Sequence, residues 1–565
     1  MTSLDAAGEA LTLPDRALSW GLGVGVLLLY VLTFASVPTS DGLSFIAMVD
    51  GAIASGTGRL PVISNAPFSY YLAFFLKRAA LALRLLIPTL LVFQGINAVV
   101  TALGSVAFYR TIRLIGGAPF WAFVGTMLMA TSYGVWYFAN GEVHHVALAI
   151  LLFLFYRLTL IRRSVEGPSS YAALVGLGLP NAVAVFFHQE HFLFGLVAVA
   201  LLLVGRPWRR ASREIAAYGG AGTLGTMLLI LVTGWLAAGA RTLKAIVAWY
   251  FWQLGYLVSE YEPEPIWLIA LRLMKGQLTA FVYGVQVIAD AARDWTLLQV
   301  GAVRVFAALT VLALALAATP AAGVWWQRRR ITGDLRAFAV AAVVWLFAYP
   351  VLLSWYFPAV TEYYLKTMPP LVLLLVLGPI ARERVGLASR WLRAVGAGLL
   401  LLVVTVNGLS AILPWYRYGI MRDRLAGVAS ALFRPGDLVV SIESGIDPVL
   451  AGRVEQVHVK DLLYWEGKER GFETIHTEIG ARLDRGQRVF VHNLIPSRFA
   501  LTGLNDPSRN QRRDRYDLRD FEAFLDELSA HYQLVQVLAY WEESKEPLYL
   551  FGRRLEPLYE VRRRF

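Results

Sequence analysis

The chain has 565 residues, of which 57% are hydrophobic and only 16% are charged. A soluble protein of this size needs more charge on its surface, so this composition excludes a soluble globular enzyme and indicates a polytopic membrane protein. The net charge is +12, and many of the arginines lie in short loops between apolar runs. This placement indicates loops that stay in the cytoplasm, rather than a surface that binds nucleic acid. The absence of cysteine excludes disulfides and thiolate metal sites.

Eleven apolar segments are predicted to cross the membrane as helices. They cover residues 19–36, 87–109, 119–138, 146–162, 171–187, 191–205, 217–237, 300–325, 337–356, 367–381 and 394–413. The first segment is too long for the core of a signal peptide, and no small-residue cleavage site follows it. We therefore expect it to be retained.

Arginine-rich connections alternate with connections that hold no lysine or arginine, ANGEVHH (139–145) and HQEH (188–191). Basic loops stay in the cytoplasm, so this alternation predicts a cytoplasmic N-terminus and an external C-terminal tail. Both of these polar turns then lie at the outer face.

Two outer connections are long. In the first, about 37–86, the part from 68 to 86 is apolar but contains Lys77, Arg78 and Arg84, which favours a helix lying in the interface over a span. The second, about 238–299, holds KAIVAWYFWQLGYLV, whose aromatic residues are typical of the headgroup belt.

The composition changes after residue 420, where charged residues become frequent. Four segments are typical of strands, and DLRDFEAFLDELSAHY (517–532) predicts an amphipathic helix. The strand segments are GDLVVSIES (436–444), GQRVFVHNL (486–494), YQLVQVLAYW (532–541) and PLYLFGRRL (547–555). We therefore expect a transmembrane domain, 1–419, and a soluble extracytoplasmic α/β domain, 420–565.

Two carboxylates, Asp41 and Asp50, follow the first span in TSDGLSFIAMVDGAI (39–53). Nine residues apart on a helix they would not share a face, so we expect one of them to enter a given site. Asp41 also stands where a helix N-cap would, and Asp50 is equally explained as a solvated loop carboxylate.

Histidines and glutamates gather at two successive outer turns. Glu142, His144 and His145 stand in the first, and His188, Glu190 and His191 in the second; together they include four of the eight histidines of the chain. Such residues can bind a divalent metal, but a hydrogen-bonding turn at the interface explains them at least as well.

Tyr363, Tyr364 and Lys366 lie at the outer end of the tenth predicted span, just before a pair of prolines. A lysine at this depth can extend to the headgroups, or it can pair with the phosphate of a lipid.

This arrangement resembles the GT-C glycosyltransferases, and within them the bacterial relatives of transmembrane O-mannosyltransferase. The matching segments are TSDGLSFIAMVDGAI, LPVISNAPFSYYLAFFLKR (60–78), GEVHHVAL (141–148) and GLGLPNAVAVFFHQEH (176–191). Two features depart from the family pattern. His144 stands where the family tends to have tyrosine, and the spacing from Asn181 to His188 is longer than expected.

The resemblance implies a GT-C-like helical fold and transfer of a sugar from a polyprenyl-phosphate-linked donor to an acceptor hydroxyl of a protein, lipid or glycan. It implies inversion at the anomeric carbon, at the outer face of a bacterial inner membrane. Asp41 matches the catalytic aspartate of the family. The residues expected to bind substrate are Asp50, Glu142, His144, His145, His188, Glu190, His191, Tyr363, Tyr364 and Lys366. The resemblance implies no required cofactor and leaves open whether a divalent metal binds. The alternatives are a lipid or polysaccharide transporter and an assembly protein that acts through its C-terminal domain.

Overall fold

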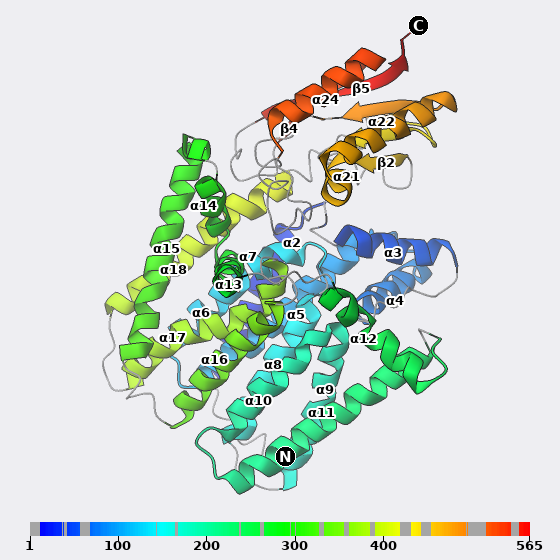
Figure 1. Ribbon diagram of the computed structural model, residues 1–565. Coiled ribbons are helices and arrows are strands. Elements are labelled where there is room, and N and C mark those ends of the chain that lie inside the picture. The colour runs from blue at the N-terminus through cyan, green and yellow to red at the C-terminus, as the bar shows by residue number, and fades with distance from the viewer. Residues whose placement is uncertain are drawn as a thin grey trace. The chain divides into compact units, whose positions relative to one another are not determined.

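The computed structural model describes residues 12–36, 38, 42–56, 68–142, 144–163, 168–236, 239–259, 265–293, 295–299, 301–326, 333–354, 361–384, 390–417, 431–441, 454–492, 494, 516–543 and 553–564 (Figure 1). The chain divides into two compact units. The first comprises residues 1–34, 38–285 and 308–408, and the second comprises residues 35–37, 286–307 and 409–565. The sequence boundary expected at residue 420 thus falls within the second unit.

Nine helical segments in the described part of the chain are long and apolar enough to cross a membrane. They are α2 (Leu13–Leu32), α5 (Thr89–Leu114), α8 (His144–Arg163), α9 (Pro168–Phe187), α11 (Trp208–Leu236), α15 (Gly301–Trp326), α16 (Gly333–Leu353), η4 (Thr361–Thr367) continued by α17 (Met368–Arg384), and α18 (Arg390–Asn407) with its continuation to Arg417. Two shorter apolar helical segments coincide with the predicted spans 119–138 and 191–205. These are α6 (Pro119–Thr131), and η2 (Gln189–Leu193) with α10 (Phe194–Leu203). The polytopic helical fold class is confirmed, while the count of eleven crossings stays a prediction.

The first outer connection contains two helices, α3 (Gly42–Ala54) and α4 (Ser69–Ala82). With 14 residues, α4 is too short to span a bilayer. Its Phe75 side chain is 61% exposed, and the Arg78 guanidinium lies over the Phe74 ring, 5.6 Å from its centroid. Exposed aromatic surface beside a cation is what an interfacial helix needs, so these features agree with the predicted role of this segment.

The second long connection is also helical. It contains α12 (Leu243–Ser259), α13 (Ile266–Phe281), α14 (Gly284–Arg293) and η3 (Trp295–Gln299). Of these, α13 belongs to the first unit, where Gly276 gives room for the Tyr364 ring of η4: a Cβ at Gly276 would lie 2.4 Å from Tyr364 Cε2. This glycine therefore allows α13 to pack directly beside η4.

Arginines in the predicted cytoplasmic loops bind the ends of helices. Asp15, in the first turn of α2, forms ion-pair contacts of 2.8 and 2.9 Å with the Arg113 guanidinium at the end of α5. At the end of α8, Arg162 donates to the carbonyls of Leu201 (2.6 Å) and Val204 (2.9 Å), which lie at the end of α10. Helix C-termini leave carbonyls without partners inside the helix, and these guanidinium groups satisfy them.

Helices α9 and α11 lie side by side in the first unit and approach one another through glycines (Figure 1). A Cβ at Gly178 of α9 would lie 2.6 Å from the backbone nitrogen of Gly222 and 2.8 Å from the carbonyl oxygen of Tyr218. Small residues at helix crossings let the backbones approach closely, which is how membrane helices gain packing energy.

The second unit holds a five-stranded sheet in the order β2-β1-β3-β5-β4. Its strands are β1 (Leu438–Ser441), β2 (Glu455–His458), β3 (Val489–His492), β4 (Tyr532–Glu543) and β5 (Arg553–Arg563). Strand β1 runs parallel to β2 and β3, and β5 runs antiparallel to β3 and β4. The small α/β domain predicted from sequence is therefore present in the described residues.

Three helices accompany this sheet, α21 (Val459–Glu466), α22 (Lys468–Asp484) and α24 (Leu518–His531). Alternate strand residues face α22 and α24 and form one buried core with Ile475, Ile479, Phe521 and Phe524. Helix α24 begins with a capping box, in which the backbone nitrogen of Asp520 donates to Asp517 and the nitrogen of Asp517 donates to Asp520. The predicted helix 517–532 is confirmed. Of the segment 547–555 expected to form the last strand, residues 553–555 lie in β5, and residues 547–552 lie outside the described residues.

The glycine contact between α9 and α11 predicts that Gly178→Ala destabilises the bundle. The added methyl would press on backbone atoms of α11 that cannot rotate away, at a cost of about 1–3 kcal/mol. Thermal unfolding of the purified protein in detergent measures this. Gly176→Ala is the matched control, because a Cβ there meets nothing within 4 Å. Equal midpoints for the two variants would contradict the packing described.

Candidate functional site

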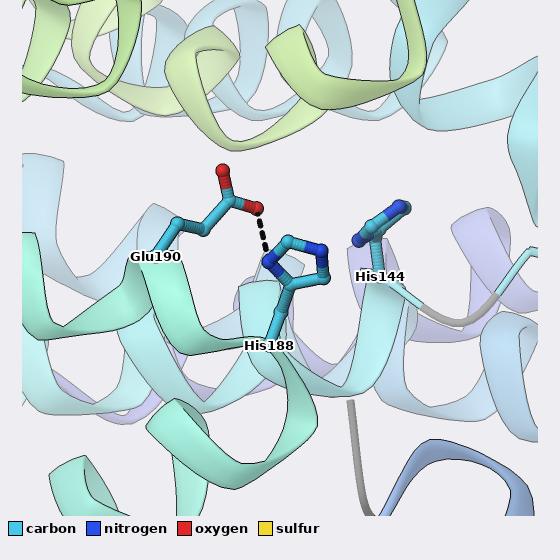
Figure 2. A group of neighbouring side chains, drawn as sticks. All are labelled: His144, His188 and Glu190. Atoms are coloured by element: carbon cyan, nitrogen blue, oxygen red, sulfur yellow. Dashed lines mark ion pairs between the residues drawn. The ribbon is translucent and has the colours of Figure 1, made fainter. Parts of the chain in front are cut away.

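A buried ionic group lies where three elements of the first unit meet, at η2, η4 and the start of α8. The Oε1 atom of Glu190, in η2, lies 2.8 Å from His188 Nδ1. The Lys366 ammonium of η4 forms an ion pair with the same oxygen. Figure 2 shows the Glu190 and His188 side chains pointing toward one another, with His144 from α8 beside them. Sequence positions 144, 188–190 and 366 are thus brought into one cluster.

Lys366 is 1% exposed and Glu190 is 4% exposed. Each charge would cost several kcal/mol to bury alone, so each depends on the other. The Lys366 ammonium also lies over two aromatic faces, 5.3 Å from the Tyr363 centroid and 5.6 Å from the Tyr349 centroid. The cation is therefore held by one carboxylate and two tyrosine rings.

Histidine and tyrosine rings surround this pair. The His144 ring lies 5.1 Å from the His188 ring and 5.6 Å from the Tyr363 ring, measured between centroids. His191 Nδ1 lies 3.2 Å from the Tyr349 hydroxyl. The result is a buried cluster of imidazole and phenol rings, whose N–H and O–H groups can donate hydrogen bonds.

Three of the predicted residues make contacts outside the ionic group. His145 Nε2 donates to the carbonyl of Val135 at 2.8 Å, which fixes the start of α8 against the preceding short helix α7 (Tyr133–Trp136). The backbone carbonyl of Glu142 accepts from Asn97 Nδ2 at 2.6 Å. Tyr364 is fully buried against Gly276.

Asp41 lies outside the residues that the structure describes. The next residue, Gly42, begins α3 and packs against the turn before α8: a Cβ on Gly42 would lie 3.1 Å from the carbonyl oxygen of Gly141. The start of α3 therefore touches the turn that carries Glu142. Asp50, further along α3, is exposed and accepts a hydrogen bond of 2.5 Å from the Thr89 hydroxyl.

Two residues of the site were not among the sequence candidates. Tyr349 of α16 contacts both His191 and Lys366, and Asn97 of α5 binds the turn before α8 through Ala139 and Glu142. Both are polar side chains within predicted spans, which marks them as candidates without showing which neighbour each one faces.

The donor atoms of His144, His188 and Glu190 lie within 4.8 Å of one another, a set that a divalent metal could use. The Lys366 ammonium, however, already pairs with Glu190. A second cation at the same carboxylate would meet the charge of Lys366 in a buried setting, so these residues do not fit a metal unless that lysine moves away.

The sequence matches no protein-family model, and no curated protein matches it by sequence. Among solved structures, the chain is similar to ArnT from Cupriavidus metallidurans bound to undecaprenyl phosphate. The identity is 12%, the TM-score is 0.51, and the match covers 95% of this chain and 97% of that one. At this identity the likeness concerns the fold alone: the chain has an ArnT-like fold, which confirms the polytopic helical fold expected from sequence.

Two further structures are similar at lower scores. The apo state of the same ArnT has 12% identity and a TM-score of 0.39, with the same coverage. The Archaeoglobus fulgidus oligosaccharyltransferase, in complex with Zn and sulfate, has 13% identity and a TM-score of 0.46 over 83% of this chain and 67% of that one. With scores this low, neither adds to the fold assignment.

The mutual dependence of Lys366 and Glu190 can be measured by a double-mutant cycle. Lys366→Met leaves the buried carboxylate without its lysine partner and is expected to cost about 3–5 kcal/mol of stability. The double variant Lys366→Met/Glu190→Gln removes both charges and is expected to recover much of that loss. Chemical unfolding in detergent gives the free energies of unfolding of wild type, Lys366→Met, Glu190→Gln and the double variant.

Lys468→Met is the control for this cycle, because Lys468 pairs with Asp520 at a partly exposed position. Such pairs contribute about 0–1 kcal/mol. If the effects of Lys366→Met and Glu190→Gln simply add, the two charges do not stabilise one another and the account of the cluster is wrong.

Proposed function

We propose that the protein is a membrane glycosyltransferase that moves a sugar from a polyprenyl-phosphate-linked donor to an acceptor hydroxyl at the outer face of the membrane. The observation that carries the proposal is the buried Lys366–Glu190–His188 group in a chain with a GT-C-like fold. ArnT was solved bound to undecaprenyl phosphate, which supports a lipid phosphate as part of the donor.

In the proposed reaction the acceptor oxygen attacks the anomeric carbon from the face opposite the lipid phosphate. The bond from that carbon to the phosphate oxygen breaks, so the configuration inverts and the electron pair leaves with the polyprenyl phosphate. Asp41 takes the hydroxyl proton as the new bond forms, which is the role of a general base. The resemblance to the GT-C family supplies this assignment.

The charge that develops on the departing phosphate needs preorganised cations and hydrogen-bond donors. Lys366 supplies a cation held between two tyrosine rings, and the imidazoles of His144 and His188 lie beside it. When a phosphate enters, it competes with Glu190 for Lys366. No metal is needed in this scheme, because the lysine supplies the positive charge.

The contact made by Gly42, the residue after Asp41, supports the inclusion of Asp41 in the proposed site. Gly42 touches Gly141, which is followed directly by Glu142 and, two residues later, by His144 at the start of α8. The two segments that hold Asp41 and His144 therefore approach at the backbone.

The two ends of α8 support the proposed location of the cluster at the outer face of the membrane. His144 begins the helix at the cluster, and Arg162 lies near its other end among the arginines that bind helix termini. Twenty residues of helix span about 30 Å, the thickness of the hydrocarbon core. The positive-inside rule then assigns the arginine end to the cytoplasm and the cluster to the outer face.

Asp41→Asn is expected to lower transfer by about 10²–10⁴-fold, because it removes the base while keeping the shape of the side chain. Purified protein in nanodiscs, given a panel of undecaprenyl-phosphate monosaccharides and membrane acceptors, releases undecaprenyl phosphate, which mass spectrometry measures. Asp526→Asn, an exposed change on α24, is the matched control. Transfer at the wild-type rate by Asp41→Asn would refute its role as base.

Lys366 is expected to bind the phosphate of the donor and product. Lys366→Met should weaken binding of undecaprenyl phosphate by at least about tenfold, since a charge-assisted contact is worth roughly 1.5–3 kcal/mol. Lys366→Arg, which keeps the charge, should weaken it less. Binding is measured in nanodiscs at a temperature where all variants are folded, with Lys468→Met as control. Unchanged binding by Lys366→Met would remove this residue from the proposed site.

A further inference from the structure

A second group of metal-ligand side chains lies on the surface of the C-terminal unit, far in sequence from the proposed active site. His476 is on α22, and Glu527 and His531 are one turn apart on α24. One donor atom from each lies within 4.8 Å of the other two. The two helices pack on the same face of the sheet, where the Phe472 and Phe524 rings stack with centroids 4.4 Å apart.

The imidazole of His531 is oriented for coordination. Its Nδ1 lies 2.9 Å from the backbone carbonyl oxygen of Glu527. A carbonyl oxygen only accepts, so Nδ1 carries the proton and donates, and Nε2 keeps its lone pair. Metal-binding histidines usually donate their other ring nitrogen to a carbonyl or carboxylate in this way, which fixes the tautomer and the ring.

The imidazole of His476 presents a nitrogen that has no hydrogen-bond partner. Its Nε2 is buried and lies 3.8 Å from Glu527 Oε1, too far for a hydrogen bond. Two ligands of a tetrahedral zinc ion, each about 2.0–2.2 Å from the metal, lie roughly 3.4 Å apart. A small side-chain movement therefore brings this pair to coordinating distance.

We infer that His476, Glu527 and His531 form a binding site for a divalent transition metal, most readily zinc. Two imidazoles and one carboxylate are a ligand set that zinc accepts, and the fourth position faces solvent because Glu527 is 58% exposed at its side chain. The ion would join α22 to α24 and so hold together the two helices that cover one face of the sheet. This inference does not depend on the proposed transferase activity.

Zinc titration of the full-length protein tests the site. The protein carries no polyhistidine tag, is stripped with EDTA in detergent, and is titrated with ZnCl₂ by calorimetry. We expect wild type to bind one more zinc per chain than His531→Ala, or to bind it at least about tenfold more tightly. The test compares variants because the buried group at His144, His188 and Glu190 is present in every sample. Any zinc bound there contributes equally to wild type and variants.

Matched variants keep the test independent of folding. His531 is exposed, so its replacement is expected to leave the fold intact, and His476→Ala and Glu527→Gln should show the same loss. Glu522→Gln makes the same charge change at an exposed position of α24 and should bind like wild type. Zinc should raise the unfolding midpoint of wild type more than that of His531→Ala. Identical zinc stoichiometry and affinity in wild type, His476→Ala and His531→Ala would overturn the inference.

Discussion

The buried pair of Lys366 and Glu190 is the interaction on which one end of the helical bundle depends, the end predicted to face outward. Both side chains are nearly inaccessible, and in an apolar setting neither charge can be left alone. The pair ties η2, which leads into α10, to η4, which leads into α17. Both elements are short 3₁₀ segments that lead directly into apolar helices, so the pair links the beginnings of two helices.

The same pair explains why so many polar rings gather at this end. A buried cation needs further partners, and Tyr349, Tyr363 and the histidines around them supply aromatic faces and ring nitrogens. A group built to hold a cation against one carboxylate is also suited to receive a phosphate, because the anion can replace the carboxylate. In the proposed transferase, structural and chemical roles thus fall on the same residues.

Much of this arrangement could be predicted from the sequence. Hydrophobicity located all eleven apolar helical segments, and the contrast between arginine-rich and arginine-free turns pointed to one end of the bundle as the site. Both signals are local in the sequence. The helix of the C-terminal domain could be predicted for the same reason, since its apolar period and its Asp517 cap lie within one short segment.

The pairing of residues far apart in the chain could not be predicted. Nothing in the turn at 188–191 shows that Glu190 meets Lys366. From the sequence, Glu190 is explained by a hydrogen-bonding turn or a metal site, and Lys366 by contact with headgroups or a lipid phosphate. Tyr349 and Asn97 were missed because a polar side chain within an apolar run carries no sign of which neighbour it faces. The antiparallel pairing of β5 with both β3 and β4 could not be predicted either, because a strand segment does not itself show which strands lie beside it.

The central claim is that the cluster around Lys366 receives a lipid phosphate at the outer end of α8. An experimental structure of the protein with bound undecaprenyl phosphate tests it most directly. The account predicts a phosphate oxygen within ion-pair distance of Lys366, with His188 as a neighbour and the start of α3 beside it. A phosphate bound instead among the arginines at the other end of α8, with the Lys366–Glu190 pair unchanged, would contradict it.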